Sequence, residues 1–132
     1  MKNRILFPFF YQSDNRQRYV ETLEIAKKTN AEVVLFTSIS EDAKEEEFDN
    51  VYLHLLELNG FYQTTQNDWR TNNIQFKRVI GKGDMSMSLQ SYLEKSDNPT
   101  KIVARPSYPK FNTPVLKKLL EKLSIPPNMI VN

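Results

Sequence analysis

The sequence predicts an α/β protein with a doubly wound, five-stranded parallel sheet and helices on both faces. Three observations support this fold class. Strand-like and helix-like segments alternate strictly, the strand-like segments are short and apolar, and no internal repeat, linker or low-complexity segment interrupts the 132 residues. Strict alternation is typical of parallel sheets whose crossover connections are helices, and a chain of this length can bury one core. We therefore expect residues 1–132 to form a single domain.

The first expected elements are a buried strand and a helix. Residues 4–10 are almost continuously apolar, as in a strand that is covered on both faces. Pro8 marks the end of this strand, because proline cannot donate to a central ladder. Ser13 and Asp14 are candidate N-caps for the next helix. The apolar stripe of that helix consists of Tyr19, Leu23 and Ala26.

The second strand and the longest helix follow. Residues 32–39 are rich in the β-branched and aromatic side chains that favour strands. The helix after them carries an apolar stripe at steps of three and four residues, made of Phe48, Val51, Leu55, Leu58, Tyr62, Thr65 and Trp69. Gly60 lies off this stripe and costs roughly 1 kcal/mol relative to alanine. Either a continuous helix or a break at Gly60 fits the pattern.

The remaining pattern predicts three strands and two helices. In chain order we expect a strand at 74–80, a turn at 81–84, a helix from Met85 to before Asn98, a strand at 101–104, a helix at 113–123 and a short strand within 125–131. Asp84 is a plausible N-cap, and the alternating strand at 74–80 is expected at an edge of the sheet. Pro114 falls at the first helical position, where its missing N–H costs little.

Composition excludes several classes of protein. A hydrophobic content of 39% and a charged content of 26% fit a globular chain. Cysteine is absent and His54 is the single histidine, which excludes disulfide scaffolds, thiolate metal sites and multi-histidine metal sites. No apolar run approaches the ~18 residues of a membrane span, and a net charge of +2 does not indicate nucleic acid. We expect a cytoplasmic protein without membrane or nucleic-acid partners.

The junction after the strand at 101–104 is the main candidate site. Ligands of parallel α/β sheets bind outside the carboxyl ends of strands, and phosphate binders place glycines there so that the backbone can approach the phosphate. This junction has no glycine and three prolines. Arg105 and Lys110 can instead hold a phosphate or carboxylate by charge, and Tyr108 or Phe111 can stack a base. The alternative is a surface loop stiffened by its prolines.

Other candidate contacts are weaker signals. Asn112 and Thr113 stand at the expected start of the last helix, where Thr113 offers a hydroxyl. Asp14 either binds a ribose hydroxyl or caps its helix, and Ser38 is a further candidate contact to a cofactor. The Gly81–Gly83 segment is either a phosphate turn or a tight strand-to-helix turn, because the dinucleotide fingerprint needs a third glycine.

Two features near the first strand have open interpretations. Phe9, Phe10 and Tyr11 form an aromatic cluster at its exit. They either fill the space that a nucleotide would occupy or line a small apolar pocket. We interpret His54, which has no acid or nucleophile near it in sequence, as a surface or half-buried histidine.

Over almost its whole length the chain resembles the universal stress protein family. The similar segments are Arg4–Phe9, Ala31–Ile39, Val79–Asp84, Lys101–Ala104, Asn112–Val115 and Asn128–Val131. The resemblance implies an adenine nucleotide α-hydrolase-like fold with the strand order 3-2-1-4-5.

The resemblance also implies a degenerate nucleotide site. Nucleotide-binding members carry an aspartate just after the first strand, whereas here the first acid, Asp14, comes several residues late. Those members also carry Gly-x-x-Gly, a spacer and Gly-Ser or Gly-Thr after the fourth strand. Here Arg105 stands in place of the first glycine, and Asn112 and Thr113 replace the final pair. The resemblance therefore implies a member of the family that binds no cofactor through this loop. The alternative is that ATP or AMP binds there.

We therefore expect a non-catalytic stress-type protein that forms a homodimer. Its interface is predicted at Met129, Ile130 and Val131, because an apolar edge strand exposes unpaired backbone groups unless a partner covers it. The alternative function is a sensor that binds a small anionic ligand or a nucleotide through the 105–115 loop. An enzyme has less support, since the sequence contains no P-loop and no motif for nucleotidyl transfer.

Overall fold

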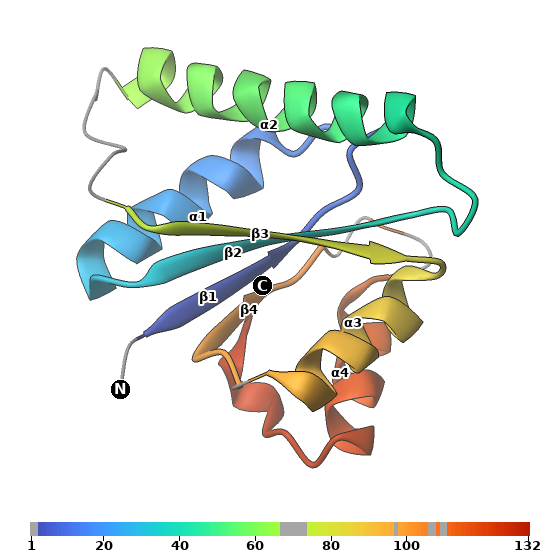
Figure 1. Ribbon diagram of the computed structural model, residues 1–132. Coiled ribbons are helices and arrows are strands. Elements are labelled where there is room, and N and C mark those ends of the chain that lie inside the picture. Colours follow the sequence, from blue (N-terminus) through green and yellow to red (C-terminus); the bar gives the residue numbers. More distant parts are fainter. Residues whose placement is uncertain (1–2, 67–73, 97, 106–107, 109–110) are drawn as a thin grey trace.

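The computed structural model describes residues 3–66, 74–96, 98–105, 108 and 111–132. Within them, one parallel sheet has the strand order β3-β2-β1-β4-β5. The strands are β1 (Arg4–Pro8), β2 (Glu32–Ile39), β3 (Phe76–Lys82), β4 (Lys101–Val103) and β5 (Ile130–Val131). The predicted fold class and strand order are confirmed, with β1 in the middle and β3 and β5 at the edges (Figure 1).

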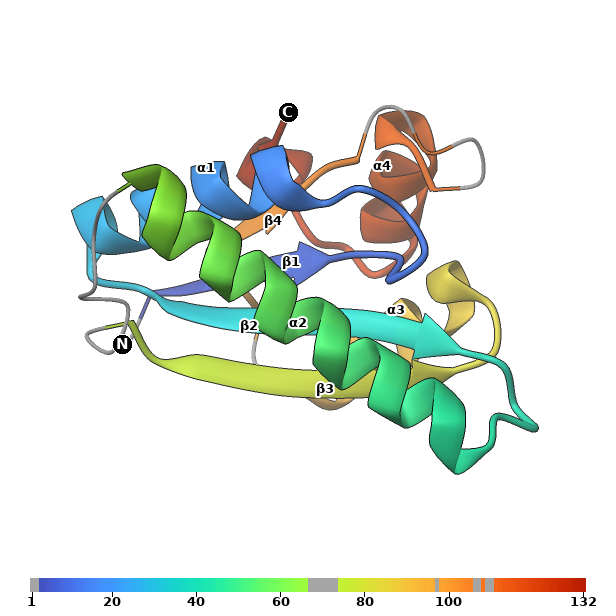
Figure 2. The same ribbon diagram turned by 90° about the horizontal axis from the view of Figure 1, so that it is seen from above.

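Helices cover both faces of the sheet, as predicted. The helices α1 (Arg16–Thr29) and α2 (Glu45–Gln66) lie on one face, and α3 (Met85–Lys95) and α4 (Thr113–Lys122) lie on the other (Figure 1). Seen from above, α2 crosses β2 and β3 (Figure 2). A short 3-10 helix, η2 (Pro127–Met129), precedes β5. In the part of the chain that the structure describes, no helix is both long and apolar enough to cross a bilayer.

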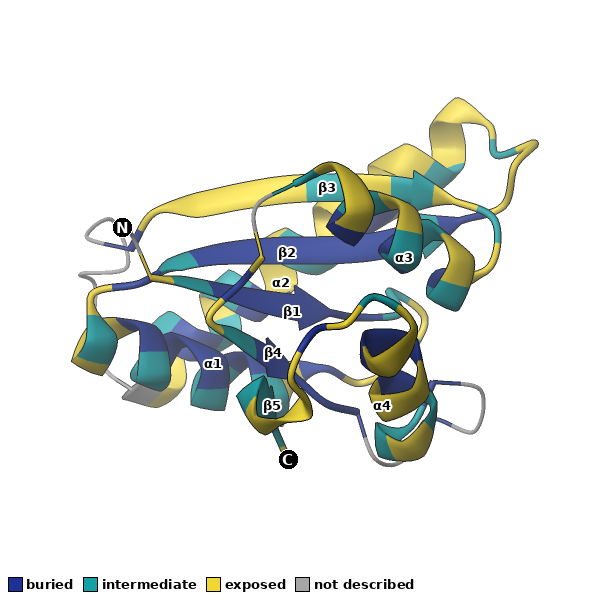
Figure 3. Ribbon diagram, turned by 90° about the horizontal axis from the view of Figure 1, so that it is seen from below, coloured by how far each residue is buried: buried dark blue, intermediate teal, exposed yellow. Residues whose placement is uncertain are grey.

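Two cores form because successive side chains of a strand point to opposite faces. Phe7 and Leu35 pack on the side of α1 and α2, whereas Leu6 and Phe36 pack on the side of α3 and α4. The helices contribute Tyr19, Leu23, Val51, Leu58 and Tyr62 to the first core, and Met85, Leu89, Leu93, Leu116, Leu119 and Leu120 to the second. The strand β3 differs from the central strands, because most of its residues are exposed (Figure 3).

Local chemistry explains where most elements begin and end. The strand β1 ends at Pro8, as expected. The Asp84 carboxylate accepts a hydrogen bond from the Met87 N–H and caps α3, and Asn112 caps α4 through the Val115 N–H. The long helix α2 runs through Gly60 without a break. A methyl group at Gly60 would have no neighbour within 4 Å among the described residues, so close packing there does not require glycine.

Some expected boundaries are wrong. The last strand lies within residues 125–131, as expected, but it is only two residues long, because the preceding prolines start a 3-10 turn over Pro127–Met129. The strand β3 starts at Phe76 rather than at residue 74 and runs on to Lys82. Trp69, which was expected on the stripe of the second helix, lies outside the described residues.

Candidate ligand site at the switch point

The switch point of the sheet lies between the carboxyl ends of β1 and β4, where the strand order reverses. The pairing of β1 with β4 is recorded as far as Leu6 and Ile102, whereas its pairing with β2 continues to Pro8 and Phe36. The pairing of β1 with β4 therefore ends earlier along β1 than its pairing with β2. The chain beyond the two ends carries the aromatic cluster at Phe9 and Phe10 and the candidate anion ligand Arg105.

Aromatic side chains from two segments, the one after β1 and the one between β4 and α4, pack together at this point. We call Phe10, Arg105, Tyr108 and Phe111 the switch-point cluster. The Phe10 ring makes edge contacts with Tyr108, at a centroid distance of 4.6 Å, and with Phe111, at 6.5 Å. Arg105, Tyr108 and Phe111 are only 4%, 8% and 1% exposed. Of the two open interpretations of the aromatic residues after β1, these contacts favour the filling of space over an open pocket.

The Asn15 side chain is the polar centre behind the cluster. It is fully buried, and its Oδ1 accepts a short hydrogen bond from the Tyr108 hydroxyl. With Oδ1 occupied, Nδ2 is the donor, and it lies 2.9 Å from the Phe10 carbonyl oxygen and 2.8 Å from His54 Nε2. Sequence reasoning missed Asn15, because an asparagine just before a helix reads as a cap. Asn15 does occupy the N-cap position of α1, but its side chain makes no capping hydrogen bond.

Arg105 is buried within the cluster. Its guanidinium carbon lies 5.5 Å from the ring centroid of Phe7 and 4.7 Å from that of Tyr108. Its Nη2 donates to the Asp14 carbonyl oxygen at 3.3 Å, while Nη1 is buried without a hydrogen-bond partner among the described residues. Burial lowers the pKa of Arg105, but a guanidinium still carries its charge at neutral pH. Arg105 is therefore not part of a solvated surface loop.

A second arginine, Arg18 of α1, joins the helix to the ends of two strands. Its Nη2 donates to the Ala104 carbonyl at 2.8 Å and to the Val131 carbonyl at 2.9 Å, and its Nη1 forms an ion pair with Glu21 at 2.6 Å. These bonds satisfy carbonyl groups just after β4 and at the end of β5. An arginine on an amphipathic helix is usually interpreted as a solvated side chain, so this role could not be predicted from the sequence.

The other predicted contacts lie apart from the cluster or support local structure. The Asp14 carboxylate faces solvent and pairs with Arg16 at 2.9 Å, and hydrogen bonds from Arg16 lower the pKa of Asp14 to about 2. The Thr113 hydroxyl donates to Asn132 Oδ1. The Ser38 hydroxyl donates to the carbonyl of Gly83 in the turn before α3. Lys110 lies outside the described residues.

The Gly81–Gly83 turn has a structural explanation. The Gly83 backbone has a φ of 93°, which favours glycine, and a methyl group on Gly81 would come within 2.7 Å of Ser88 Cβ on α3. Both glycines are thus required by the tight turn from β3 to α3.

His54 is half-buried, as expected, and it contacts the polar centre rather than a nucleophile. Its ring stacks on Phe9 at a centroid distance of 5.9 Å, and its Nε2 faces the Asn15 amide. Burial lowers the pKa of His54, and the nearby Arg105 adds to this effect. Among the described residues no group of three or more histidine, cysteine or acidic side chains is placed to hold a metal ion.

Two solved structures are similar to the whole chain. A universal stress protein from Archaeoglobus fulgidus matches at a TM-score of 0.62 with 13% sequence identity, covering 99% of this chain and 98% of that protein. A universal stress family protein from Burkholderia pseudomallei matches at a TM-score of 0.52 with 16% identity, covering 98% of this chain and 93% of that protein. No protein-family model and no curated protein matches the sequence. The chain therefore has the fold of universal stress proteins.

Proposed function

We propose that this protein is a universal stress protein that acts in the cytoplasm without catalysis and does not bind ATP in the manner of its family. The likeness in fold extends over nearly the full length of both matched proteins. This fold hosts a ligand at the switch point between β1 and β4. The function of the present chain therefore depends on whether that point is open or filled.

The observation that carries the proposal is the packing of the switch-point cluster. Phe10, Tyr108 and Phe111 contact one another at the place where a nucleotide would lie. A phosphate nest needs close approach of the backbone, and no glycine follows β4. Asp14 is engaged by Arg16 and faces solvent. Each of these features supports the loss of family-type ATP binding.

Isothermal titration with Mg-ATP and with AMP tests the loss of nucleotide binding. We expect no heat of binding at millimolar nucleotide, no nucleotide released from the purified protein on denaturation, and no phosphate release from ATP above the buffer rate. Low-micromolar affinity for ATP, with NMR shift changes at Phe111 and Asn112, would overturn the proposal.

We further propose a homodimer joined through Met129, Ile130 and Val131. The strand β5 is at the edge of the sheet and pairs with β4 through Ile130 and Val131. The side chains of these three residues are only half-buried within one chain. A two-fold copy would cover them and the unpaired backbone beside them.

Multi-angle light scattering tests this dimer. We expect a mass of twice 15.5 kDa for the wild type, and of a single chain for Ile130→Lys. A wild-type mass of one chain at micromolar concentration would refute the dimer, and an unchanged dimer in Ile130→Lys would refute this interface.

A second candidate function rests on Arg105. Its buried Nη1 has no hydrogen-bond partner among the described residues, and an unpaired buried charge is costly. A small anion that reaches this atom would compensate it, so the alternative is a sensor of a small anionic ligand. Titration with inorganic phosphate tests this alternative, because Arg105→Ala with Lys110→Ala should abolish any binding. Undiminished affinity in the double variant would exclude it.

A further inference from the structure

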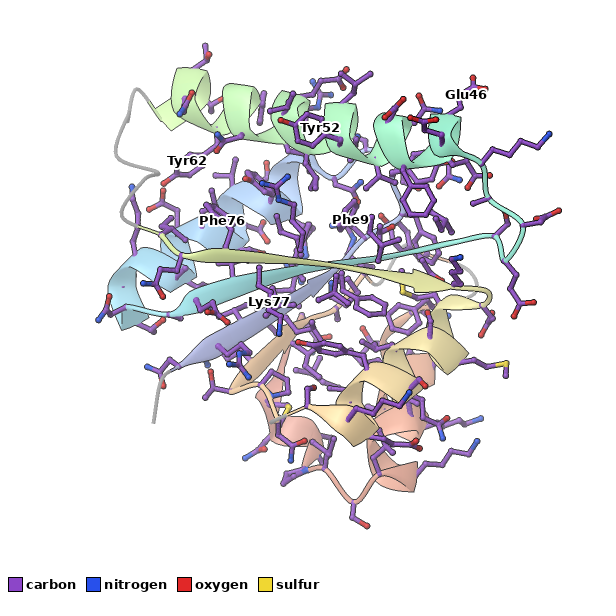
Figure 4. All side chains as sticks on the ribbon, in the orientation of Figure 1. Phe9, Glu46, Tyr52, Tyr62, Phe76 and Lys77 are labelled. Atoms are coloured by element: carbon purple, nitrogen blue, oxygen red, sulfur yellow. The ribbon has the colours of Figure 1, made fainter. Side chains whose placement is uncertain are left out.

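An exposed apolar surface runs along β3 and the adjacent side of α2. We define the β3-edge surface as Phe48, Tyr52 and Leu56 of α2 with Phe76, Arg78 and Ile80 of β3. Tyr52, Leu56 and Ile80 are 50%, 51% and 40% exposed, and Phe48 and Phe76 are more than one-third exposed. Phe76 points from β3 toward the α2 side of the sheet, whereas Lys77 points to the opposite side (Figure 4). The alternation of a strand places Arg78 and Ile80 on the side of Phe76.

Among the described residues, the backbone of β3 pairs with a neighbouring strand along one side only. All seven of its residues are in register with β2, from Phe76 opposite Val33 to Lys82 opposite Ile39. Since β3 ends the sheet, no described strand pairs with its other side. A row of unpaired N–H and C=O groups is a template for an added strand. The opposite edge, β5, offers only two residues.

Two cavities open beside this strand, under α2. One, of about 130 Å³, is lined by Tyr19, Leu35, Tyr52, Leu55, Leu56, Asn59, Phe76 and Arg78. The other, of about 90 Å³, shares Leu35, Tyr52, Leu55 and Arg78 and adds Phe48 and Ile80 among others. The Arg78 guanidinium lies 5.6 Å from the Tyr52 ring centroid. This pair borders both cavities, so one lies toward Phe76 and the other toward Ile80.

The two cavities follow each other along β3, an order that suits an added strand. Every second side chain of an added strand would point toward α2. Two neighbouring side chains of this set would face the two cavities, one each. In peptide recognition by strand addition, the main chain provides affinity and pockets for alternate side chains provide specificity. The β3-edge surface contains both parts of this recognition mode.

The charge of β3 indicates the chemistry of the partner. The strand carries Lys77, Arg78 and Lys82 and no acid. Pairing β3 with a second copy of itself would gather six basic side chains, and lysines at an edge are a known means of preventing such pairing. Of the acidic residues in the first turn of α2, Glu46 points away from the sheet (Figure 4). An extended segment with acidic residues is the complementary occupant.

We propose that the β3-edge surface binds an extended peptide segment of another protein, with alternating apolar and acidic residues, as an added strand. The apolar side chains enter the two cavities on the α2 side, and the acidic side chains point to the opposite side of the sheet, where Lys77 lies (Figure 4). This binding is independent of the switch point and does not depend on whether a nucleotide binds there.

NMR titration of the ¹⁵N-labelled protein with short blocked peptides tests the proposal. The probe alternates isoleucine with glutamate, a second peptide replaces glutamate with lysine, and a third carries proline at its centre. We expect saturable shifts in the amides of residues 76–82 with the glutamate peptide, at least tenfold weaker binding of the other two, and weakening by salt. No shifts in β3 at millimolar glutamate peptide, or equal binding of the lysine peptide, would overturn the proposal.

Substitutions locate the surface and exclude self-association. Lys77→Glu should lower the affinity for the glutamate peptide and raise the affinity for the lysine peptide. Ile80→Glu should weaken binding of the glutamate peptide at least tenfold. Met87→Glu is the matched control, because Met87 is an equally unpartnered apolar residue, 73% exposed on α3, and its change should leave binding unaltered. Light scattering of the peptide-free protein tests whether a second copy occupies the surface instead. If Ile80→Glu lowers the mass and Met87→Glu does not, a second copy binds there, and the proposal of a peptide ligand is refuted.

Discussion

The switch point and the β3-edge surface use aromatic residues in opposite ways. At the switch point, Phe10, Tyr108 and Phe111 pack on one another, and the Tyr108 hydroxyl is satisfied by buried Asn15. Along β3, Tyr52 and Phe76 stay exposed beside two cavities. The aromatic rings of the first region are packed within one chain, while those of the second are left exposed.

This difference teaches where to look for function in a fold that is shared by many proteins. The fold predicts a ligand at the switch point, but fold alone does not establish function. Here the aromatic residues at the switch point pack on one another, and incomplete packing is found on the α2 side of an edge strand. Three predictions test whether the two regions differ in this way.

The largest expected effect separates the two regions directly. Phe111→Ala removes a fully buried ring from the switch-point cluster and should lower the free energy of unfolding by about 3–5 kcal/mol. Leu56→Ala truncates a half-exposed side chain of the β3-edge surface and should change it by at most about 0.5 kcal/mol. Urea denaturation of both variants measures the contrast.

A small loss in Phe111→Ala would mean that the cluster is loosely packed and can open for a ligand. The cavity that this variant leaves should not restore ATP binding, because the glycines and the aspartate are still missing. Micromolar ATP affinity in Phe111→Ala would show that the aromatic ring alone blocks the site.

The sequence was sufficient to predict the sheet, but it was not sufficient to predict the contacts within the candidate site. The element order follows from the alternation of short apolar segments, such as residues 32–39, with helical stripes. The strand order follows from the family resemblance. The role of Asn15 could not be predicted, since its partners Tyr108 and His54 are far away in the sequence. Likewise, Arg105 was correctly placed at the strand end, but its burial depends on Phe7, a residue of a different strand.

The next prediction concerns Gly60, on the exposed helix α2. Because a Cβ atom there meets nothing within 4 Å, Gly60→Ala should raise the free energy of unfolding by about 0.5–1 kcal/mol through helix propensity. Gly81→Ala is the control, since its Cβ would lie 2.7 Å from Ser88 Cβ and should destabilise the protein. Destabilisation by Gly60→Ala would indicate that α2 packs against something at this position and that its outer side is not free.

The smallest expected effect is a pH dependence at the polar centre behind the cluster. Neutral His54 accepts a hydrogen bond at Nε2 from the Asn15 amide, whereas a protonated ring would place an N–H against this donor. Burial lowers the pKa of His54 in the folded state, with Arg105 acting in the same direction and Glu57 and Asp14 opposing it.

Because the unfolded chain has the ordinary histidine pKa of about 6.5, it binds the proton at a higher pH than the folded protein does. The stabilising contribution of neutral His54 is therefore complete above this value and is lost as the pH falls through the lowered pKa of the folded state. We expect the urea midpoint of the wild type to fall between pH 7.5 and pH 5.5, and this fall to be reduced in His54→Gln, whose amide oxygen can still accept from Asn15. The NMR titration of the ring, which is unambiguous because His54 is the only histidine, should give a midpoint below 6.5. An NMR titration midpoint above 6.5, or an equal fall of the urea midpoint in His54→Gln, would mean that the Asn15 side chain is open to water. The switch point would then be less completely packed than its contrast with the β3-edge surface requires.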